Sequence, residues 1–278
     1  MSPKPDPDAV RKLGILAGSG TLPRAVAEAR AERGAGVFVV DLGGAAGEWI
    51  AGFAHERVSL GQIGRVLSLL AREGCDAVTM AGGLVRPSLT SVRFDRAGLA
   101  LLPRVARLFR KGDDGLLSGV ADLFEEHGFP VIGAEAFLPR SVAPAGAIVG
   151  TVPEGTALDD IATGRAILDA LSPFDIGQAV VVAQGRCLAV EGAEGTAAML
   201  ARVAALREAG GGVLIKMPKR GQDARVDRPA IGPDTVSAAA AAGLAGIAVE
   251  AGGVFVLEGE RTRRLAGEAG VFLYGVAP

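Results

Sequence analysis

The densest cluster of polar side chains lies in the loop Gly221–Pro229, which reads GQDARVDRP. Asp223 and Asp227 in this loop could bind a metal ion or orient a water molecule. Arg225, and Lys216 at the end of the apolar run before the loop, could neutralise phosphate oxygens. Charged residues in a Gly/Pro-rich loop after a buried strand commonly form sites, although an irregular solvated loop has the same composition. The residue types therefore favour phosphate chemistry assisted by carboxylates.

Two further pairs of carboxylates could contribute to such a site. Glu191 ends a predicted strand, and Glu194 opens the helix that follows it. Asp113 and Asp114 are adjacent and come shortly after Lys111. Carboxylates are the hard oxygen ligands that Mg²⁺ prefers. Asp113 and Asp114 suit the first turn of a helix equally well, because they cap it and complement its dipole, so both interpretations stay open.

Two glycine turns, each directly after an apolar run, could hold a phosphate or a nucleotide. The first contains Gly18, Ser19 and Gly20, and the second contains Gly82 and Gly83. Glycine lets a ligand approach the backbone, and the helix after the first turn offers free N–H donors. Arg86, shortly after the second turn, could clamp a phosphate with two parallel hydrogen bonds. Either turn could equally be a connection without a ligand.

The first turn also matches part of the dinucleotide-binding pattern. Asp41 lies near the offset of about 20 residues that is expected of a ribose-binding acid. Pro23, however, stands where that pattern has its third glycine. An NAD(P)-binding oxidoreductase therefore remains an alternative.

Composition narrows the class of protein. The chain has 278 residues, 49% hydrophobic and 22% charged, which is typical of a folded globular protein. Its net charge of −2 gives no general attraction to nucleic acid. Cys75 and Cys187 lie far apart and are expected to be reduced thiols. His55 and His127 lie near no other candidate ligand, which disfavours a histidine metal centre or a Ser-His-Asp triad.

The elements that must position these residues alternate between strand and helix over the first 135 residues. Predicted strands at 13–17, 37–40, 77–80 and 131–133 alternate with predicted helices at 22–33, 62–73 and 116–127. This alternation predicts a parallel sheet with right-handed crossovers. The N-terminus lacks the apolar core of a signal peptide, and no stretch reaches the ~20 apolar residues of a membrane span. We therefore expect a cytoplasmic protein.

The second half of the chain has a different pattern. Residues 137–158 are rich in Pro and Gly and are interpreted as a linker between a domain at 11–136 and one at 159–278. The apolar runs 180–183 and 187–190 flank a Gln-Gly turn and predict a hairpin. Further strands are predicted at 213–216, 254–257 and 271–274, and helices at 159–171, 196–209 and 235–242. The expected fold class is α/β, with a parallel-sheet domain followed by a mixed α/β (α+β) domain.

Taken together, these segments resemble one family, the LpxI-type UDP-2,3-diacylglucosamine pyrophosphatases of Gram-negative bacteria. The matching segments run in the family's order through nearly the whole chain. They are 13–23, 61–87, RKGDDGLL at 110–117, DIGQ at 175–178, VEGAEGTAAMLAR at 190–202 and QDARVDRPAIG at 222–232.

The resemblance implies a Rossmann-like N-terminal domain and a distinct C-terminal domain, with a lipid-bearing substrate held between them. It implies Mg²⁺-dependent hydrolysis of the pyrophosphate to UMP and 2,3-diacylglucosamine 1-phosphate (lipid X), a step of lipid A biosynthesis. Asp227 is the implied catalytic carboxylate, which binds metal or orients water. Pyrophosphate hydrolysis needs charge neutralisation and an aligned water more than a covalent nucleophile, which fits the polar residues of this chain.

These considerations give three sets of predicted site residues. The predicted catalytic residues are Asp227, Asp223, Arg225 and Lys216. The predicted substrate-binding residues are Gly18, Ser19, Gly20, Gly82, Gly83, Arg86, Lys111, Gln178, Thr196 and Gln222. The predicted Mg²⁺ ligands are Asp227, Asp223, Glu191, Glu194, Asp113 and Asp114.

One departure from the family pattern bears on activity. Ala197 stands in EGTAAML where the family typically has the acidic residue of EGTDAML, and Ser19 stands where the family often has Gly. The missing acid keeps a non-catalytic nucleotide- or lipid-binding protein as an alternative. Transient contact with the surface of the inner membrane and a homodimer both stay open.

Overall fold

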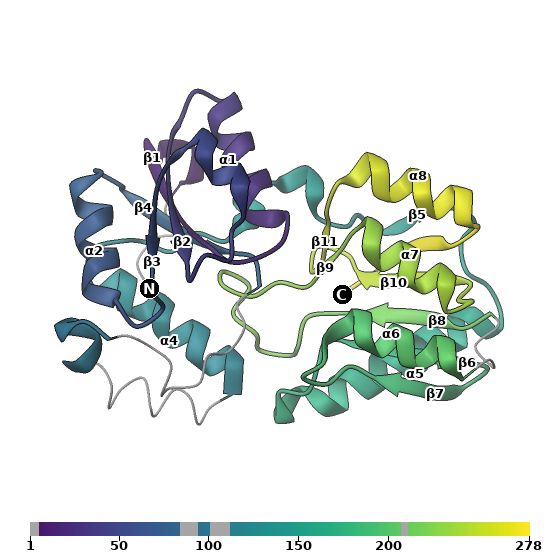
Figure 1. Cartoon of the computed structure of the whole chain (residues 1–278). Helices are drawn as coiled ribbons and strands as arrows, with labels where there is room; N and C mark the ends of the chain where they lie inside the picture. Colours follow the sequence, from purple (N-terminus) through teal and green to yellow (C-terminus); the bar gives the residue numbers. More distant parts are fainter. Residues whose placement is uncertain (1–5, 84–93, 101–111, 207–210) are drawn as a thin grey trace. The chain divides into compact units, whose positions relative to one another are not determined.

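The computed structural model describes residues 6–83, 94–100, 112–206 and 211–278, with the backbone alone at 112–114 (Figure 1). The chain forms two compact units. The N-terminal unit comprises residues 1–139 together with Asp223–Asp227, and the C-terminal unit comprises residues 140–222 and 228–278. A short piece of the second half of the chain thus belongs structurally to the first unit.

The N-terminal unit is built on a four-stranded parallel sheet. In spatial order its strands are β3 (Ala54–Val58), β2 (Gly36–Leu42), β1 (Lys12–Ala17) and β4 (Ala77–Ala81). Its helices are α1 (Leu22–Glu32), α2 (Ile63–Arg72) and α4 (Gly112–Glu126), with short 3-10 turns at Pro7–Ala9, Glu48–Gly52 and Ala134–Ala136. β1 and β4 are almost continuously buried, as expected of central strands in a parallel sheet.

One core of this unit joins the sheet to α2 and α4. It contains Leu16 of β1, Phe38 of β2, Leu70 of α2 and Phe124 of α4, each less than 5% exposed. Gly14 lies opposite α2, and a Cβ there would come within 2.4 Å of Leu70 Cδ2. α2 and α4 are therefore fixed against the sheet by close apolar packing.

The C-terminal unit contains a six-stranded mixed sheet. In spatial order its strands are β5 (Gly146–Val149), β12 (Phe272–Val276), β10 (Gly246–Glu250), β8 (Val213–Lys216), β6 (Ala179–Ala183) and β7 (Arg186–Val190). β8, β10 and β12 are parallel to one another, while β5, β6 and β7 add antiparallel pairings. A separate parallel pair is formed by β9 (Ala230–Ile231) and β11 (Phe255–Val256).

Helices cover both faces of this sheet. They are α5 (Thr156–Leu171), α6 (Gly195–Ala205), α7 (Pro233–Ala241) and α8 (Gly259–Ala269), with 3-10 turns at Pro139–Ser141 and Ser172–Phe174. Val181 of β6 belongs to a core with α6, α7 and α8, while its neighbours Val180 and Val182 belong to a second core with α5. The alternation along one strand thus feeds two apolar layers, and Figure 1 shows α5 apart from α7 and α8.

The α/β fold class, the parallel first sheet and the mixed second sheet are confirmed. The predicted hairpin is β6–β7, and both turn residues have positive φ, 53° at Gln184 and 75° at Gly185, as its tight turn requires. The described part of the chain contains no helix long and apolar enough to cross a membrane.

Several elements differ from the sequence prediction. The stretch that we interpret as a linker contributes β5, the edge strand beside β12. The predicted strand at 131–133 is a single bridge between Val131 and Val78, and the predicted strand at 254–257 is only the two-residue β11. β3 and β10 have no counterpart in the prediction. β3 reads AHERV, with exposed polar side chains, because it lies at the sheet edge.

Candidate functional site

The two predicted glycine turns lie side by side at the carboxyl ends of β1 and β4. Gly18 N donates to Ala81 O at 2.9 Å, and Ser19 N donates to Gly83 O at 2.8 Å. In return Gly83 N donates to Ser19 O at 3.0 Å, and the Ser19 hydroxyl donates to Gly83 O at 3.0 Å. Carboxyl ends of neighbouring parallel strands are where ligands bind in open α/β sheets.

This close approach requires glycine at two positions. A Cβ on Gly18 would lie 2.4 Å from Gly83 O, and one on Gly82, whose φ is +89°, would lie 2.4 Å from Ser19 O. Gly20, with φ of +93°, has no atom within 4 Å of such a Cβ, and Thr21, the N-cap of α1, makes no side-chain cap hydrogen bond. Open space beside an uncapped helix N-terminus is what a phosphate group needs.

Asp41, the acid of the dinucleotide alternative, is engaged within the fold. Its side chain is fully buried at the end of β2. One carboxylate oxygen accepts a hydrogen bond from Ala46 N at 3.0 Å, and the other pairs with Arg57 Nε at 2.9 Å. Both oxygens thus hold neighbouring segments together, which leaves the NAD(P) alternative without its ribose-binding acid.

A second site lies in the C-terminal unit, where β6 begins and β7 and β8 end. The antiparallel pairing of β6 with both neighbours brings Gln178, Glu191 and Lys216 to this edge, and the first turn of α6 adds Thr196. Four residues predicted to act on substrate or metal therefore lie together, although the first and the last are 38 positions apart in the sequence. We call them the Glu191 cluster.

The Glu191 cluster is a chain of short hydrogen bonds. Glu191 accepts from Gln178 N at 2.8 Å and from the Thr196 hydroxyl at 2.6 Å. The Thr196 oxygen accepts from Lys216 Nζ at 2.6 Å. Glu191 and Lys216 are only 9% and 8% exposed. A buried charge needs such partners: the Glu191 carboxylate fixes the Thr196 hydroxyl, and that hydroxyl in turn holds the Lys216 ammonium group.

Gly177 is needed for this arrangement. Its φ is +51°, and a Cβ there would come within 2.2 Å of the Glu191 carbonyl oxygen. The backbone geometry of the DIGQ motif therefore places Gln178 N within hydrogen-bond distance of the Glu191 carboxylate.

The hydrogen bonds given above for the Glu191 cluster do not include Glu194, which was predicted as a metal ligand. Its carboxylate pairs with Arg202, in the last turn of α6, at 2.5 Å. Hydrogen bonds from its own backbone N–H and from Arg202 hold the pKa of Glu194 below its ordinary value. Its charge is thus matched by a neighbour on α6.

The remaining predicted catalytic residues lie in Asp223–Asp227, within the N-terminal unit. Asp223 Oδ1 accepts from Arg225 Nε at 3.0 Å, and Oδ2 pairs with a terminal nitrogen of Arg225 at 2.7 Å. The other terminal nitrogen of Arg225 pairs with Glu125 at 2.6 Å. These carboxylates, Asp223 first, raise the pKa of Arg225. Arg225 therefore contacts protein carboxylates, where the sequence suggested phosphate oxygens.

Asp227 is half-buried and follows a tight turn. The backbone N–H groups of Val226 and Asp227 both donate to Asp223 O, at 3.1 and 3.2 Å. The Asp223 carbonyl thus fixes the turn before Asp227, while the Asp223 carboxylate holds the Arg225 side chain.

Gln222 shapes the loop that precedes this turn. Its side-chain oxygen accepts from Lys219 N at 2.9 Å, and the Lys219 ammonium pairs with Asp175. Neither Lys219 nor Asp175 was among the predicted site residues. The one signal in the sequence was that Asp175 begins the DIGQ motif. The structure adds that Asp175 adopts a left-handed conformation, φ 56°, which non-glycine residues seldom use.

No three His, Cys, Asp or Glu side chains gather into a metal-binding group among the described residues. His55 Nδ1 and His127 Nδ1 each contact a nearby backbone carbonyl, at 2.9 and 2.8 Å.

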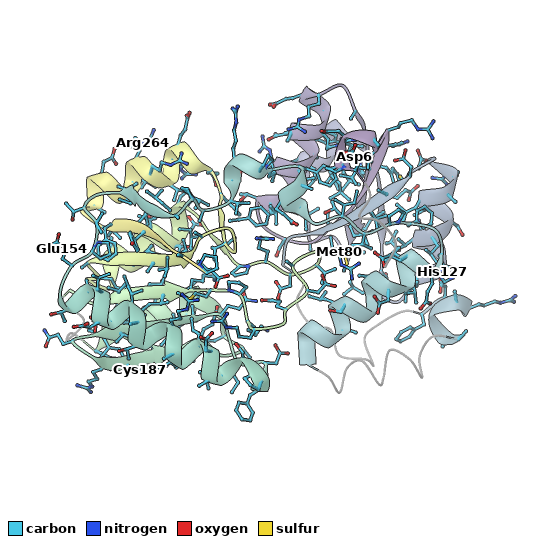
Figure 2. All side chains as sticks on the ribbon, turned by 180° about the vertical axis from the view of Figure 1, so that it is seen from behind. Asp6, Met80, His127, Glu154, Cys187 and Arg264 are labelled. Atoms are coloured by element: carbon cyan, nitrogen blue, oxygen red, sulfur yellow. The ribbon has the colours of Figure 1, made fainter. Side chains whose placement is uncertain are left out.

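Cys75 and Cys187 are free thiols, as predicted. Figure 2 labels Cys187 in the C-terminal unit and His127 in the N-terminal unit. Burial raises the pKa of Cys75 to about 11. Four predicted positions lie outside the description: Arg86, Lys111 and the side chains of Asp113 and Asp114.

Comparison with known proteins covers nearly the whole chain. A sequence model of the LpxI N-terminal domain matches residues 12–141, and one of the LpxI C-terminal domain matches residues 144–274. The UDP-2,3-diacylglucosamine pyrophosphatase LpxI of Caulobacter vibrioides is 39% identical over 276 residues, which cover 97% of this chain and 99% of that protein.

A solved structure was also found, the N5-carboxyaminoimidazole synthase of Aspergillus clavatus in complex with ADP and 5-aminoimidazole ribonucleotide. It is 17% identical, and the alignment covers 66% of this chain and 41% of that chain. Its TM-score of 0.23 is too low to support any comparison of folds or sites. The domain matches and the full-length relative, in contrast, agree with each other in order and extent, and the chain therefore belongs to the LpxI family.

Proposed function

We propose that this chain hydrolyses the pyrophosphate bond of UDP-2,3-diacylglucosamine. One water molecule is consumed, and the products are UMP and 2,3-diacylglucosamine 1-phosphate, a step of lipid A biosynthesis. The observation that carries the proposal is the 39% identity to the Caulobacter pyrophosphatase over 97% of this chain. The two glycine turns of the N-terminal unit and the Glu191 cluster of the C-terminal unit support the proposal, because each offers groups that can bind phosphate.

In the N-terminal unit, the glycine turns would bind phosphate. The open space at Gly20 lies at the start of α1, where backbone N–H groups point towards an anion. In the C-terminal unit, Lys216 would neutralise developing negative charge, and Thr196 holds its ammonium group in place at 2.6 Å. Asp227 would bind the metal ion or orient the attacking water, the role that the family pattern gives it.

We propose Mg²⁺ as the cofactor, with few protein ligands. The described residues offer no group of three or more, and both oxygens of Asp223 are bound by Arg225. Mg²⁺ is often held by one or two carboxylates together with substrate phosphates and water. We therefore propose that Asp227 and the oxygens of the pyrophosphate together form the Mg²⁺ site. When bound, the ion would neutralise phosphate charge.

Ala197 favours one alternative, a protein that binds the nucleotide or lipid without turnover. It is exposed in the first turn of α6, beside Thr196, where the family pattern has an acid. The Glu191 cluster nevertheless forms without that acid, which favours the catalytic proposal. A cytoplasmic location, transient contact with the inner-membrane surface and a homodimer are further proposals.

The test is a turnover assay with UDP-2,3-diacylglucosamine, in Mg²⁺ and in EDTA, that measures UMP. We expect many turnovers per protein in Mg²⁺ and none in EDTA, and a loss of at least about 100-fold for Asp227→Asn. Glu268→Gln, which removes an exposed pair with Arg264 on α8, is the control expected to keep full activity. Substrate binding without UMP release would leave the binding-protein alternative in place of the enzyme.

A further inference from the structure

Helix α4 ends on a fixed acidic surface. Asp122, Glu125 and Glu126 lie in its final turns, and its last turn contains no basic residue. The carboxyl end of a helix already carries partial negative charge, so these acids are unfavourable without a cation nearby. The helix itself is held firmly, because Ala121 and Phe124 are 0% and 4% exposed in the core.

Arg225 supplies that cation from a segment 100 residues further along the chain. One terminal nitrogen pairs with Glu125 at 2.6 Å, and the other lies 4.0 Å from Asp122. The next residue, Val226, packs against the same core that holds α4. One charged and one apolar side chain therefore dock Asp223–Asp227 on the N-terminal unit.

The same guanidinium also sets the shape of the docked segment. Its Nε and one terminal nitrogen form a two-bond contact with the Asp223 carboxylate, at 3.0 and 2.7 Å. Arg225 N donates to the same carboxylate at 3.0 Å. All three guanidinium nitrogens thus have carboxylate partners. The planar fork of arginine can make such contacts on two edges at once, which lysine cannot.

We propose that Arg225 is a positioning residue: it anchors Asp223–Asp227 to α4 through Glu125 and so determines where the Asp227 carboxylate lies. The inference rests on the proposed function, because it assumes that Asp227 acts in hydrolysis. In this proposal Arg225 does not bind phosphate directly, which is the role that its residue type suggests. A displacement of about 1 Å in a catalytic group can cost on the order of 100-fold in rate, so loosening this anchor affects turnover.

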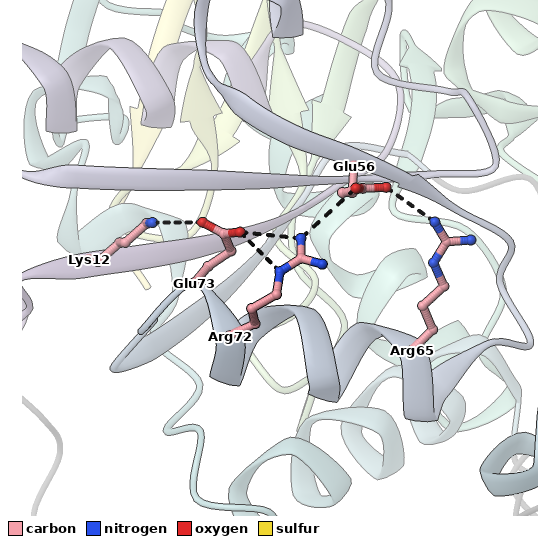
Figure 3. A network of polar contacts seen from close by, with 5 residues as sticks. All are labelled: Lys12, Glu56, Arg65, Arg72 and Glu73. Carbon is pink, nitrogen blue, oxygen red and sulfur yellow. Dashed lines mark hydrogen bonds and ion pairs between the residues drawn. The ribbon is translucent and has the colours of Figure 1, made fainter.

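The first test removes the anchor without touching Arg225. Glu125→Gln is expected to lower kcat about tenfold and to change KM by less than about twofold, because the substrate loses no contact. Glu56→Gln is the matched control, because Glu56 pairs with Arg65 and Arg72 in the N-terminal unit (Figure 3). The Glu56 side chain is 38% exposed, against 41% for Glu125. Unchanged kcat in Glu125→Gln would overturn the proposal.

A charge swap separates positioning from phosphate binding. Arg225→Glu alone is expected to lower kcat strongly, and adding Glu125→Arg is expected to recover at least about tenfold, because the pair is restored with reversed polarity. A glutamate at 225 cannot bind phosphate, so recovery would exclude a direct action of Arg225 on the substrate. A swap that recovers nothing would overturn anchoring through Glu125.

Amide hydrogen exchange measures how firmly Asp223–Asp227 is held, and it needs no substrate. The N–H groups of Val226 and Asp227 donate to Asp223 O, and we expect Glu125→Gln to speed their exchange at least about fivefold. Exchange that does not change would overturn the docking role whatever the activity. A wild-type chain that releases no UMP would refute the proposed function alone, since faster exchange in Glu125→Gln would still support the anchor.

Discussion

Replacing Thr196 by Val tests whether the Glu191 cluster is one connected unit. Valine keeps the branched shape but removes the hydroxyl that joins Glu191 to Lys216 at 2.6 Å on each side. Hydrogen bonds to charged groups contribute about 1.5–3 kcal/mol each. Glu191 keeps its bond from Gln178 N, so the net loss should be smaller than two full bonds. We expect about 2 kcal/mol of destabilisation in the C-terminal unit.

The consequence can be measured in each unit separately. For a unit of this size, about 2 kcal/mol corresponds to a fall in Tm of roughly 5–10 °C by calorimetry. Trp49, the one tryptophan of the chain, lies in the N-terminal unit, so its fluorescence transition should move little. Activity should fall about tenfold, because Lys216 loses the hydroxyl that holds its ammonium group. Thr196→Ser retains the hydroxyl and should restore both properties.

Two outcomes would refute this reasoning. If Thr196→Val stays within about 0.5 kcal/mol of wild type, water replaces the hydroxyl and the cluster is not a connected network. If Thr196→Val and Thr196→Ser lose the same stability, the side-chain methyl contact is responsible and the hydroxyl is not.

Two further perturbations test the N-terminal unit. Gly18→Ala should destabilise it by about 2 kcal/mol or more and abolish phosphate binding, because the new Cβ would lie 2.4 Å from Gly83 O; thermal unfolding checks this against Gly52→Ala, whose Cβ would meet no atom within 4 Å. The pKa of Glu73 is lowered from 4.5, chiefly by its hydrogen bond from Lys12 (Figure 3), so its stabilisation is present above that pH and is lost as the pH falls through the folded-state pKa. The Tm difference between wild type and Glu73→Gln should therefore shrink on acidification, and a constant difference would contradict the assignment.

Local patterns in the sequence were sufficient for most of the fold. The apolar runs of β1, β2 and β4 alternate with helices, and that alternation can only pack as a parallel sheet. The hairpin followed from Gln184-Gly185, since a two-residue turn of type I′ has positive φ at both positions and glycine adopts it readily. β5 could not be predicted in the same way, because its four residues become a strand only by pairing with β12 at the far end of the chain.

The candidate site was predictable in its residue types but not in its pairings. Glu191, Thr196 and Lys216 were each proposed, yet their contact depends on β6 pairing with both β7 and β8. The placement of Arg225 in the N-terminal unit was equally hidden, because it depends on a partner 100 residues earlier. Val226, an apolar residue within a charged loop, was the one local signal that this segment packs against a core.

The carboxylates show how little residue type alone says about which acids bind a metal. A carboxylate that binds a metal and one that binds a protein cation are identical in a sequence, and only the partner distinguishes them. Three of the six acids predicted as ligands have protein partners in this structure: Asp223 is held by Arg225, Glu194 by Arg202, and Glu191 by Thr196 and Gln178 N. Protein donors that already lie at 2.5–2.8 Å must be displaced before a metal can bind there. The proposed Mg²⁺ would therefore take ligands from a pyrophosphate, which brings its own oxygens, and we expect metal affinity to be weak without substrate and to rise sharply with it.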